Sequence, residues 1–253
     1  MGARQDYINA KRSGSAKAVA IEGSWAMRHA LRADLDVEKV LVCPALFRGE
    51  ESARLVAQAR ARGAWVYEFG ERVFRTLVDR DGPDGIAALV RLPQWRLADV
   101  RVEPTTRVVV LDRMELAGNL GAVIRCADGA GAAAVVLTDR RVRVSHPLVL
   151  KASMGTVFTM PVIDTSVVDA VWWMRHHGVR IVAADPAGSV SYRDANYGGP
   201  SALVLGSERY GLSDEWRSEA DVLVAIPMLG VADSLNVGHA AALLLYESLV
   251  ANL

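Results

Sequence analysis

The chain has 253 residues, of which 51% are hydrophobic, so it can bury the core of one large domain or of two ordinary ones. Its 29 basic and 29 acidic residues cancel, which argues against a uniform attraction to nucleic acid but leaves room for a local basic face. Two cysteines, Cys43 and Cys126, give neither a disulfide framework nor a metal-binding spacing. No signal segment or membrane-spanning run is found, so we expect a cytoplasmic protein. Because the cysteines have no metal-binding spacing, we also expect that it binds no metal.

The first 92 residues alternate between strand-like and helix-like segments. Short apolar runs predict strands at 18–21, 39–43, 64–67 and 86–90. Helical spacing predicts helices at 24–31, 50–62 and 71–78. We therefore predict a compact α/β domain over residues 1–92. The segment 93–105 has a proline near each end and no clear period, and we interpret it as a linker.

Residues 106–253 repeat the α/β alternation more strongly. The β-branched run RVVVL at 107–111 is typical of a strand that is buried on both faces. Further strands are expected at 133–137, 179–183 and 202–205, and helices at 120–128, 167–177 and 235–249. Strands that alternate with helices predict a parallel sheet covered on both sides.

The first segment with chemical content follows the strand at 107–111 and opens a helix. It contains Gly118, Asn119, Gly121 and Arg125. The glycines let the backbone approach a ligand, and Asn119 can cap the helix, whose free N–H groups favour an anion. Arg125 follows six residues later, where a guanidinium can fork onto a phosphate. The alternative is an ordinary capped helix that carries a surface arginine.

The second segment leaves a buried strand and runs from Leu205 through Gly206, Ser207 and Glu208 to Gly211. Ligands of open parallel sheets gather at the carboxyl ends of the strands. Gly206 would let a flat ring or a sulfonium lie against bare backbone, with Glu208 at the rim of that site. The alternative is a plain strand-to-helix turn with a solvated glutamate.

The third segment begins with Ile226, Pro227 and Met228. Pro227 ends a strand, because proline has no backbone N–H to donate to a sheet. Further along, Ser234 is placed to cap the last helix, and Asn236 falls in the first turn of that helix. Polar side chains there can hold a hydroxyl or a phosphate. The alternative is simple capping of the helix by Ser234, which we expect in addition to any function.

Taken in order, the three segments resemble the three motifs of the SpoU/TrmH branch of the SPOUT RNA methyltransferases. The matching positions are Asn119-x-Gly121-x-x-x-Arg125, Leu205-Gly206-Ser207-Glu208-x-x-Gly211, and Ile226-Pro227-Met228 with Ser234-Leu235-Asn236. Ser207 replaces the usual asparagine, as in some antibiotic-resistance members, and Ala117-Gly118 stand where the family often has a proline. The chain is most similar to 23S rRNA methyltransferases of actinomycete type, some of which confer resistance to ribosome-targeting antibiotics.

The resemblance implies a trefoil-knotted α/β catalytic domain, preceded by a small α/β substrate-binding domain similar to ribosomal proteins. It implies that S-adenosylmethionine binds bent in the knot, against Leu205, Gly206, Ser207, Ile226, Met228 and Leu235. It also implies catalytic roles for Asn119, Arg125, Glu208, Ser234 and Asn236. Two chains of the family usually pair through this domain to complete the site, so the resemblance implies a homodimer.

The implied activity is transfer of a methyl group from S-adenosylmethionine to a ribose 2′-hydroxyl of structured RNA. The expected substrate is 23S rRNA, and transfer RNA is the main rival. A basic run without intervening acids predicts contacts with the RNA backbone, or else a solvated loop, at Arg140, Arg141, Arg143 and Lys151.

Two other classes stay open. One is a non-catalytic RNA-binding or ribosome-assembly protein on the same scaffold. The other is a nucleotide-dependent oxidoreductase, but the glycines form no G-x-G-x-x-G turn in a first βαβ unit.

Overall fold

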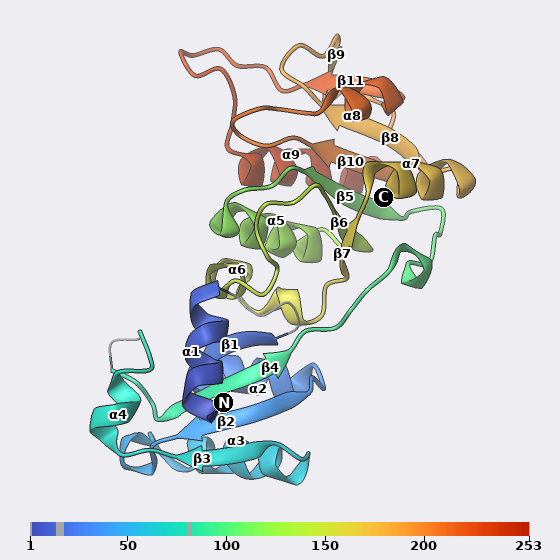
Figure 1. Ribbon diagram of the computed structural model, residues 1–253. Helices are drawn as coiled ribbons and strands as arrows, with labels where there is room; N and C mark the ends of the chain where they lie inside the picture. Colours follow the sequence, from blue (N-terminus) through green and yellow to red (C-terminus); the bar gives the residue numbers. More distant parts are fainter. Residues whose placement is uncertain (1, 14–17, 80–81, 253) are drawn as a thin grey trace. The chain divides into compact units, whose positions relative to one another are not determined.

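The computed structural model describes residues 2–13, 18–79 and 82–252, and the chain divides into two compact units (Figure 1). The first unit comprises Met1–Pro93 together with Ser145–Lys151, and the second comprises Gln94–Val144 and Ala152–Leu253. A short stretch from the middle of the chain, with Lys151 at its end, therefore groups with the first unit. No helix among the described residues has both the length and the apolar character needed to span a membrane.

The first unit is built on a four-stranded mixed sheet in the order β1-β4-β2-β3. Strand β4 is antiparallel to both of its neighbours, whereas β2 and β3 are parallel. The strands are β1 (Ala18–Glu22), β2 (Val37–Val42), β3 (Trp65–Glu68) and β4 (Ile86–Arg91). The helices are α1 (Ala3–Ser13), α2 (Gly23–Arg32), α3 (Glu50–Ala61) and α4 (Glu71–Arg75), with a 3-10 turn at Pro44–Leu46.

Helix α1 is the element of the first unit that the sequence analysis missed. It is polar on most of its surface, and it buries Ala3, Tyr7 and Ala10. These positions have the i, i+4, i+7 spacing of a helical face, but two of the three are only alanines. Tyr7 supplies most of the buried area and joins the core of this unit beside Leu41 and Phe74.

The second unit contains a seven-stranded sheet in the order β7-β6-β5-β10-β8-β11-β9, and every neighbouring pair is parallel. This is the parallel sheet that the alternation of strands and helices predicts. Its strands are β5 (Arg107–Asp112), β6 (Ala134–Thr138), β7 (Val162–Thr165), β8 (Arg180–Ala184), β9 (Val190–Ser191), β10 (Ser201–Leu205) and β11 (Val222–Ala225).

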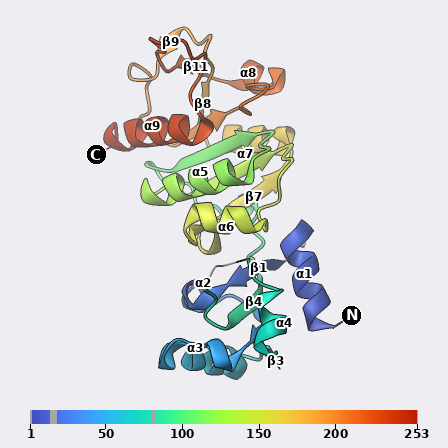
Figure 2. The same cartoon turned by 90° about the vertical axis from the view of Figure 1, so that its left-hand side faces the viewer.

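Helices cover both faces of this sheet (Figure 2). On one face, α7 and α8 contribute Trp173 and Trp216 to a core with alternate residues of the strands. On the other face, α5 and α9 pack side by side. The helices of this part are α5 (Ala117–Gly129), α6 (Pro147–Ser153), α7 (Val167–His176), α8 (Asp214–Glu219) and α9 (Val237–Val250), with 3-10 turns at Leu97–Asp99 and Thr156–Phe158.

The segment interpreted as a linker packs against the second unit. Trp95, Leu97, Val100 and Val102 are partly buried on the core that includes Trp173. The segment has no regular period because it is irregular chain with one 3-10 turn. It is packed on the core of the second unit and is not an unpacked connecting segment.

A buried polar network joins the carboxyl ends of β5 and β6 to the start of α8 in the second unit. Asp112, at the end of β5, is fully buried and accepts hydrogen bonds from the Ser213 backbone N–H at 2.8 Å and from the Thr138 hydroxyl at 3.2 Å. The Thr138 hydroxyl in turn accepts from the Trp216 indole N–H at 3.1 Å. The network ties the chain after β10 to β5 and β6, which places the loop between β10 and α8.

Replacing Thr138 with valine tests the contribution of this network to stability. The variant T138V should lower the free energy of unfolding by about 1–3 kcal/mol, because the buried Trp216 N–H loses its acceptor. Urea denaturation followed by tryptophan fluorescence measures the change. The exposed Thr105 is a matched control, and T105V should stay within about 0.5 kcal/mol of the parent. Equal midpoints for T138V and the parent would show that the network adds no stability.

Candidate active site

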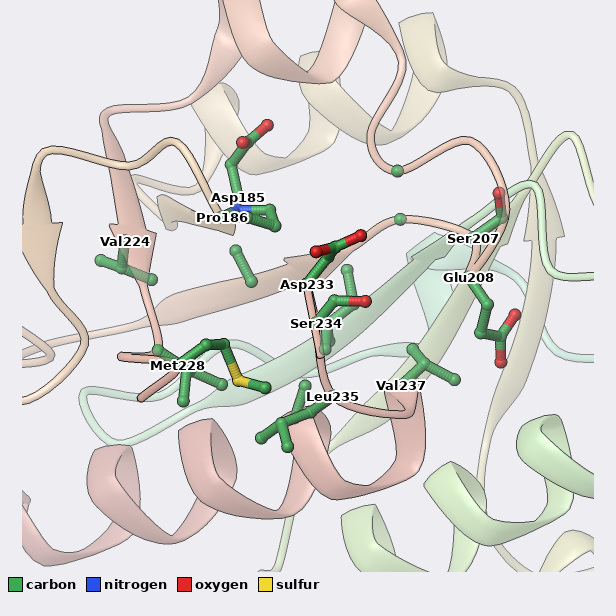
Figure 3. A pocket seen from close by; sticks show the side chains of 16 residues that line it. Asp185, Pro186, Ser207, Glu208, Val224, Met228, Asp233, Ser234, Leu235 and Val237 are labelled. Carbon is green, nitrogen blue, oxygen red and sulfur yellow. The ribbon is translucent and has the colours of Figure 1, made fainter. Parts of the chain in front are cut away.

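A pocket of about 280 Å³ opens at the carboxyl ends of β8, β10 and β11 in the second unit (Figure 3). Val224 and Met228 lie at one end of the pocket, and Ser207 and Glu208 at the other. All six residues that the sequence analysis assigned to the cofactor line it: Leu205, Gly206, Ser207, Ile226, Met228 and Leu235. Two of the five predicted catalytic residues, Glu208 and Ser234, line it as well.

The loop after β10 is shaped by close packing of two glycines. A Cβ atom on Gly206 would overlap the backbone of Gly211, so no other residue fits there without moving the loop. Between them, Ser207 and Gly211 exchange backbone hydrogen bonds of 3.2 and 2.9 Å. The Ser207 hydroxyl accepts from the Tyr210 backbone N–H at 3.1 Å. Ser207 is buried. Its short side chain accepts the hydrogen bond from Tyr210 within the loop and so keeps the turn from Ser207 to Gly211 compact.

The pocket has apolar walls and three carboxylates, which come from Asp185, Glu208 and Asp233. Asp185 accepts from Arg217 Nε at 2.7 Å and from the Ala187 backbone N–H at 2.9 Å. Burial alone would raise the pKa of Asp185, but these two donors hold that pKa below its ordinary value. The carboxyl is therefore charged at neutral pH, but Arg217 neutralises it. The negative charge that suits a cationic ligand with a large apolar part comes from Glu208 and Asp233.

A chain of side-chain hydrogen bonds joins the three predicted motifs beside the pocket. Asn119 Nδ2 donates to Glu208 Oε1, and Asn236 Nδ2 donates to Asn119 Oδ1 at 3.2 Å. The two amides and the carboxylate come from α5, from the loop after β10 and from the start of α9. Their polar atoms are partly exposed, so they can exchange these partners for a ligand hydroxyl or phosphate.

The structure corrects two capping assignments of the sequence analysis. Asn236, rather than Ser234, caps α9, and its side chain accepts from the Gly238 backbone N–H at 2.9 Å. Ser234 is exposed and lines the pocket instead. Asn119 does not cap α5, because that helix already begins at Ala117. Asn119 lies in the first turn of α5 and points its amide at Glu208.

Arg125 does not line the pocket of its own chain. It lies six residues after Asn119 on α5, about 9 Å further along the helix axis, and it is exposed. Among the described residues it has no hydrogen-bond or ion-pair partner. The pocket and the hydrogen-bonded amides therefore lie in one chain without this guanidinium among them.

The four basic residues predicted to contact RNA differ in their surroundings. Arg140 is half-buried, and its guanidinium pairs with Asp164 at 2.7 Å. Arg141 is exposed, 3.4 Å from a carboxylate oxygen of Glu115. Arg143 and Lys151 are exposed, and Lys151 belongs to the stretch that groups with the first unit. Arg140 thus carries a close ion pair with the strand β7 of the same unit.

Sequence reasoning missed several residues that line the pocket. They are Ala184, Asp185, Pro186, Val224, Asp233, Val237 and Ala240, whereas Gly211 was named as a motif position but not assigned to the cofactor. Asp185 and Pro186 follow directly after β8, so the rule that ligands gather at the carboxyl ends of parallel strands would have found them. No group of three histidine, cysteine or acidic side chains among residues 2–13, 18–79 and 82–252 is arranged to hold a metal ion.

The sequence of the second unit matches a known family. Residues 106–246, more than half of the chain, match the model of the SpoU rRNA Methylase family. The chain is 29% identical over 227 residues to the 23S rRNA (guanosine(2553)-2'-O)-methyltransferase of Bacillus subtilis, which covers 90% of this chain and 86% of that protein.

Solved structures resemble the whole chain. An AdoMet-bound rRNA methyltransferase from Sinorhizobium meliloti has a TM-score of 0.84 and 32% identity, and the match covers 91% of this chain and 86% of that one. The SpoU methyltransferase AviRb from Streptomyces viridochromogenes, in complex with AdoMet, has a TM-score of 0.87 and 26% identity, with 99% and 98% covered. With the three motifs gathered around one pocket, the chain belongs to the SpoU rRNA methylase family.

Proposed function

We propose that this protein transfers a methyl group from S-adenosylmethionine to a ribose 2′-hydroxyl of 23S rRNA in the cytoplasm. The observation that carries the proposal is the meeting of the three motifs: two of them line one pocket, and the amide of Asn119 joins both at its rim. The name of the Bacillus subtilis relative supports 23S rRNA rather than transfer RNA as the substrate.

The chemistry of the pocket fits S-adenosylmethionine. Its carboxylates suit the positive sulfonium and ammonium groups, and its apolar walls suit the adenine ring. Leu205, Gly206, Ile226, Met228 and Leu235 would hold the cofactor, while Ser207 keeps the loop closed behind it. When bound, the cofactor supplies an electrophilic methyl group, so the protein need only bring a ribose oxygen into line and keep water out.

The hydrogen-bonded amides would receive the nucleotide. In this proposal Glu208 fixes the orientation of the Asn119 amide, and Asn119 and Asn236 hold the ribose or its phosphate. Ser234, which is exposed and lines the pocket, would add a hydroxyl donor for the nucleotide. These groups bind and orient the substrate, and none of them is required to act as a strong base.

Arg125 would complete the site from a second copy of the chain. Arg125, on α5, does not line the pocket of its own chain. A homodimer through the second unit would bring Arg125 to the pocket of the partner chain and so give it a catalytic role. Helix α9 presents an exposed apolar stripe for such a contact: Leu243, Tyr246 and Val250. A guanidinium has no acceptor atom and is a poor base, so Arg125 would clamp the phosphate and the reacting oxygen, with the proton lost to phosphate or water.

Three further parts of the proposal follow from the family resemblance. The chain after β11 would pass through an earlier loop to form a trefoil knot, with the cofactor bent inside it. The first unit would act as a substrate-binding domain similar to ribosomal proteins. Arg140, Arg141, Arg143 and Lys151 would contact the RNA backbone, with Arg140 held by Asp164.

A methylation assay tests the function directly. Purified protein with radiolabelled S-adenosylmethionine should label an unmodified 23S rRNA transcript and leave a transfer RNA pool unlabelled. Mapping of ribose methylation should then find one 2′-O-methylated nucleotide. Labelling of transfer RNA alone would show that transfer RNA, and not 23S rRNA, is the substrate. Cofactor binding without methylation of either RNA would favour a non-catalytic RNA-binding protein.

Substitution of Gly206 tests the cofactor pocket. G206A should weaken S-adenosylmethionine binding at least about tenfold, because the added methyl group overlaps the Gly211 backbone and displaces the loop. Isothermal titration calorimetry measures the binding. Gly70 has no atom within 4 Å of an added Cβ, so G70A is the matched control and should bind like the parent. Unchanged affinity in a folded G206A protein would place the cofactor elsewhere.

Substitution of Arg125 tests its role and the chain from which it acts. R125A should lose methyl transfer but bind S-adenosylmethionine normally, since Arg125 does not line the pocket. Co-expression of R125A with G206A, each chain carrying a different tag, should yield mixed dimers with partial activity. In such a dimer the R125A chain gives an intact pocket and the G206A chain gives the arginine. Inactive mixed dimers would argue that Arg125 acts within its own chain.

A further inference from the structure

The loop between the two packed glycines carries an aromatic ring flanked by two cations. Tyr210 is 50% exposed. The guanidinium carbon of Arg209 lies 5.2 Å from the centre of its ring, and that of Arg141 lies 5.9 Å from it. Arg209 is the neighbour of Tyr210 in the chain, whereas Arg141 comes from the loop that follows β6. The fold therefore brings the second cation to this ring.

The position of the ring is fixed relative to the pocket. The Tyr210 backbone N–H donates to Ser207, and Ser207 is bonded to Gly211 through backbone hydrogen bonds. Both Ser207 and Gly211 line the pocket. The Arg141 backbone N–H donates to the Met114 carbonyl at 2.9 Å, which anchors the second cation to the chain after β5. Backbone hydrogen bonds thus anchor the segments that carry Tyr210 and Arg141 beside the pocket.

The charge of the two arginines is only partly neutralised. Arg141 has one carboxylate nearby, Glu115 at 3.4 Å. Arg209 has no ion pair within the described part of the chain. The adjacent Glu208 engages the amide of Asn119 instead. A ring that holds two guanidinium groups in place, on the loop that also carries Glu208, has the composition of a site for a phosphate backbone.

We propose that Arg141, Tyr210 and Arg209 form one RNA-contact site, in which the two guanidinium groups grip phosphates next to the methylated nucleotide. Tyr210 is a positioning residue: its ring orders both arginines through cation–π contacts and does not touch the reacting atoms. The inference rests on the proposed function for its substrate. It adds two residues, Arg209 and Tyr210, that the predicted basic run does not contain.

Four variants test the site. R209Q removes one cation, and Y210L removes the ring that orders both. Y210F keeps the ring and loses only the hydroxyl. R101Q is the matched control for charge, because the Arg101 side chain is 89% exposed and lies before β5, at the opposite end of that strand from the pocket. Each variant is measured for S-adenosylmethionine affinity, for KM and kcat with a 23S rRNA transcript, and for RNA affinity at several salt concentrations.

The proposal expects R209Q and Y210L to raise KM for RNA about tenfold while kcat at saturating RNA and cofactor affinity stay at parental values. The salt dependence of RNA binding should become shallower by about one phosphate contact in R209Q. Y210F and R101Q should behave like the parent. RNA affinity is measured without methyl transfer. If the unsubstituted protein bound RNA but did not methylate it, the proposed activity would be wrong, and the RNA affinities of the variants would still test this site.

Other results would overturn the inference. Parental KM and salt slope in both R209Q and Y210L would show that the rim does not contact RNA. An equal loss in Y210F would assign the effect to the Tyr210 hydroxyl and not to the cation–π contacts. If R209Q and Y210L lost affinity for a polyglutamate peptide but kept their RNA affinity, the site would be one for an acidic protein partner.

Discussion

The hydrogen-bond chain from Glu208 through Asn119 to Asn236 is the interaction on which the site depends. Its two links join residues that are 89 and 117 positions apart in the sequence, so only the tertiary fold can form it. The packing of α5 beside α9 makes this possible. A Cβ on Gly238 would meet Ala122 at 3.4 Å, and one on Gly129 would meet the Tyr246 hydroxyl at 3.3 Å. The two helices therefore run in the same direction, with their amino ends together, and small residues let them approach closely enough for Asn119 and Asn236 to bond.

The loop from Gly206 to Ser213 serves two surfaces at once. Inside, its backbone packs on itself at Gly206 and Gly211 to line the pocket. At its far end, the Ser213 N–H is fixed by the buried Asp112, which the Thr138 hydroxyl also contacts. Outside, the same loop presents Glu208 to the amides and Tyr210 to two arginines. One short segment, anchored at both ends, therefore carries both part of the pocket lining and the proposed RNA rim.

The sequence predicted β5, β6, β8 and β10 of the second unit, because a buried parallel strand is a continuous apolar run, as in RVVVL at 107–111. No range was predicted for β7, β9 or β11. The resemblance to the SpoU/TrmH motifs implied which segments meet, and the strand ends of a parallel sheet, which share one edge, account for this in the second and third segments. It could not predict that Asn236 and not Ser234 caps α9, because both are good capping residues two positions apart. It could not predict that Arg125 lies outside the pocket. The spacing of two residues on a helix fixes their distance along the axis and the angle between them, but not which other elements pack beside each of them. The sequence analysis missed the polar helix α1 because the buried face of this helix is mostly alanine.

The zero net charge of the chain is compatible with an RNA substrate once the charges are followed to their partners. Many arginines are occupied by carboxylates of the protein, as in Arg28 with Glu51 at 2.8 Å, Arg175 with Asp221 at 2.6 Å and Arg217 with Asp185 at 2.7 Å. Such pairs add acidic and basic residues in equal number and leave little field outside the molecule. Arg125 and Arg209 have no such partner among the described residues, and both are exposed. In general, phosphate binding depends on unneutralised cations and their placement, because the counterions released are set by the phosphate contacts made and not by the net charge of the chain. A neutral protein can therefore bind RNA tightly at one rim while its remaining surface has little affinity for the polyanion.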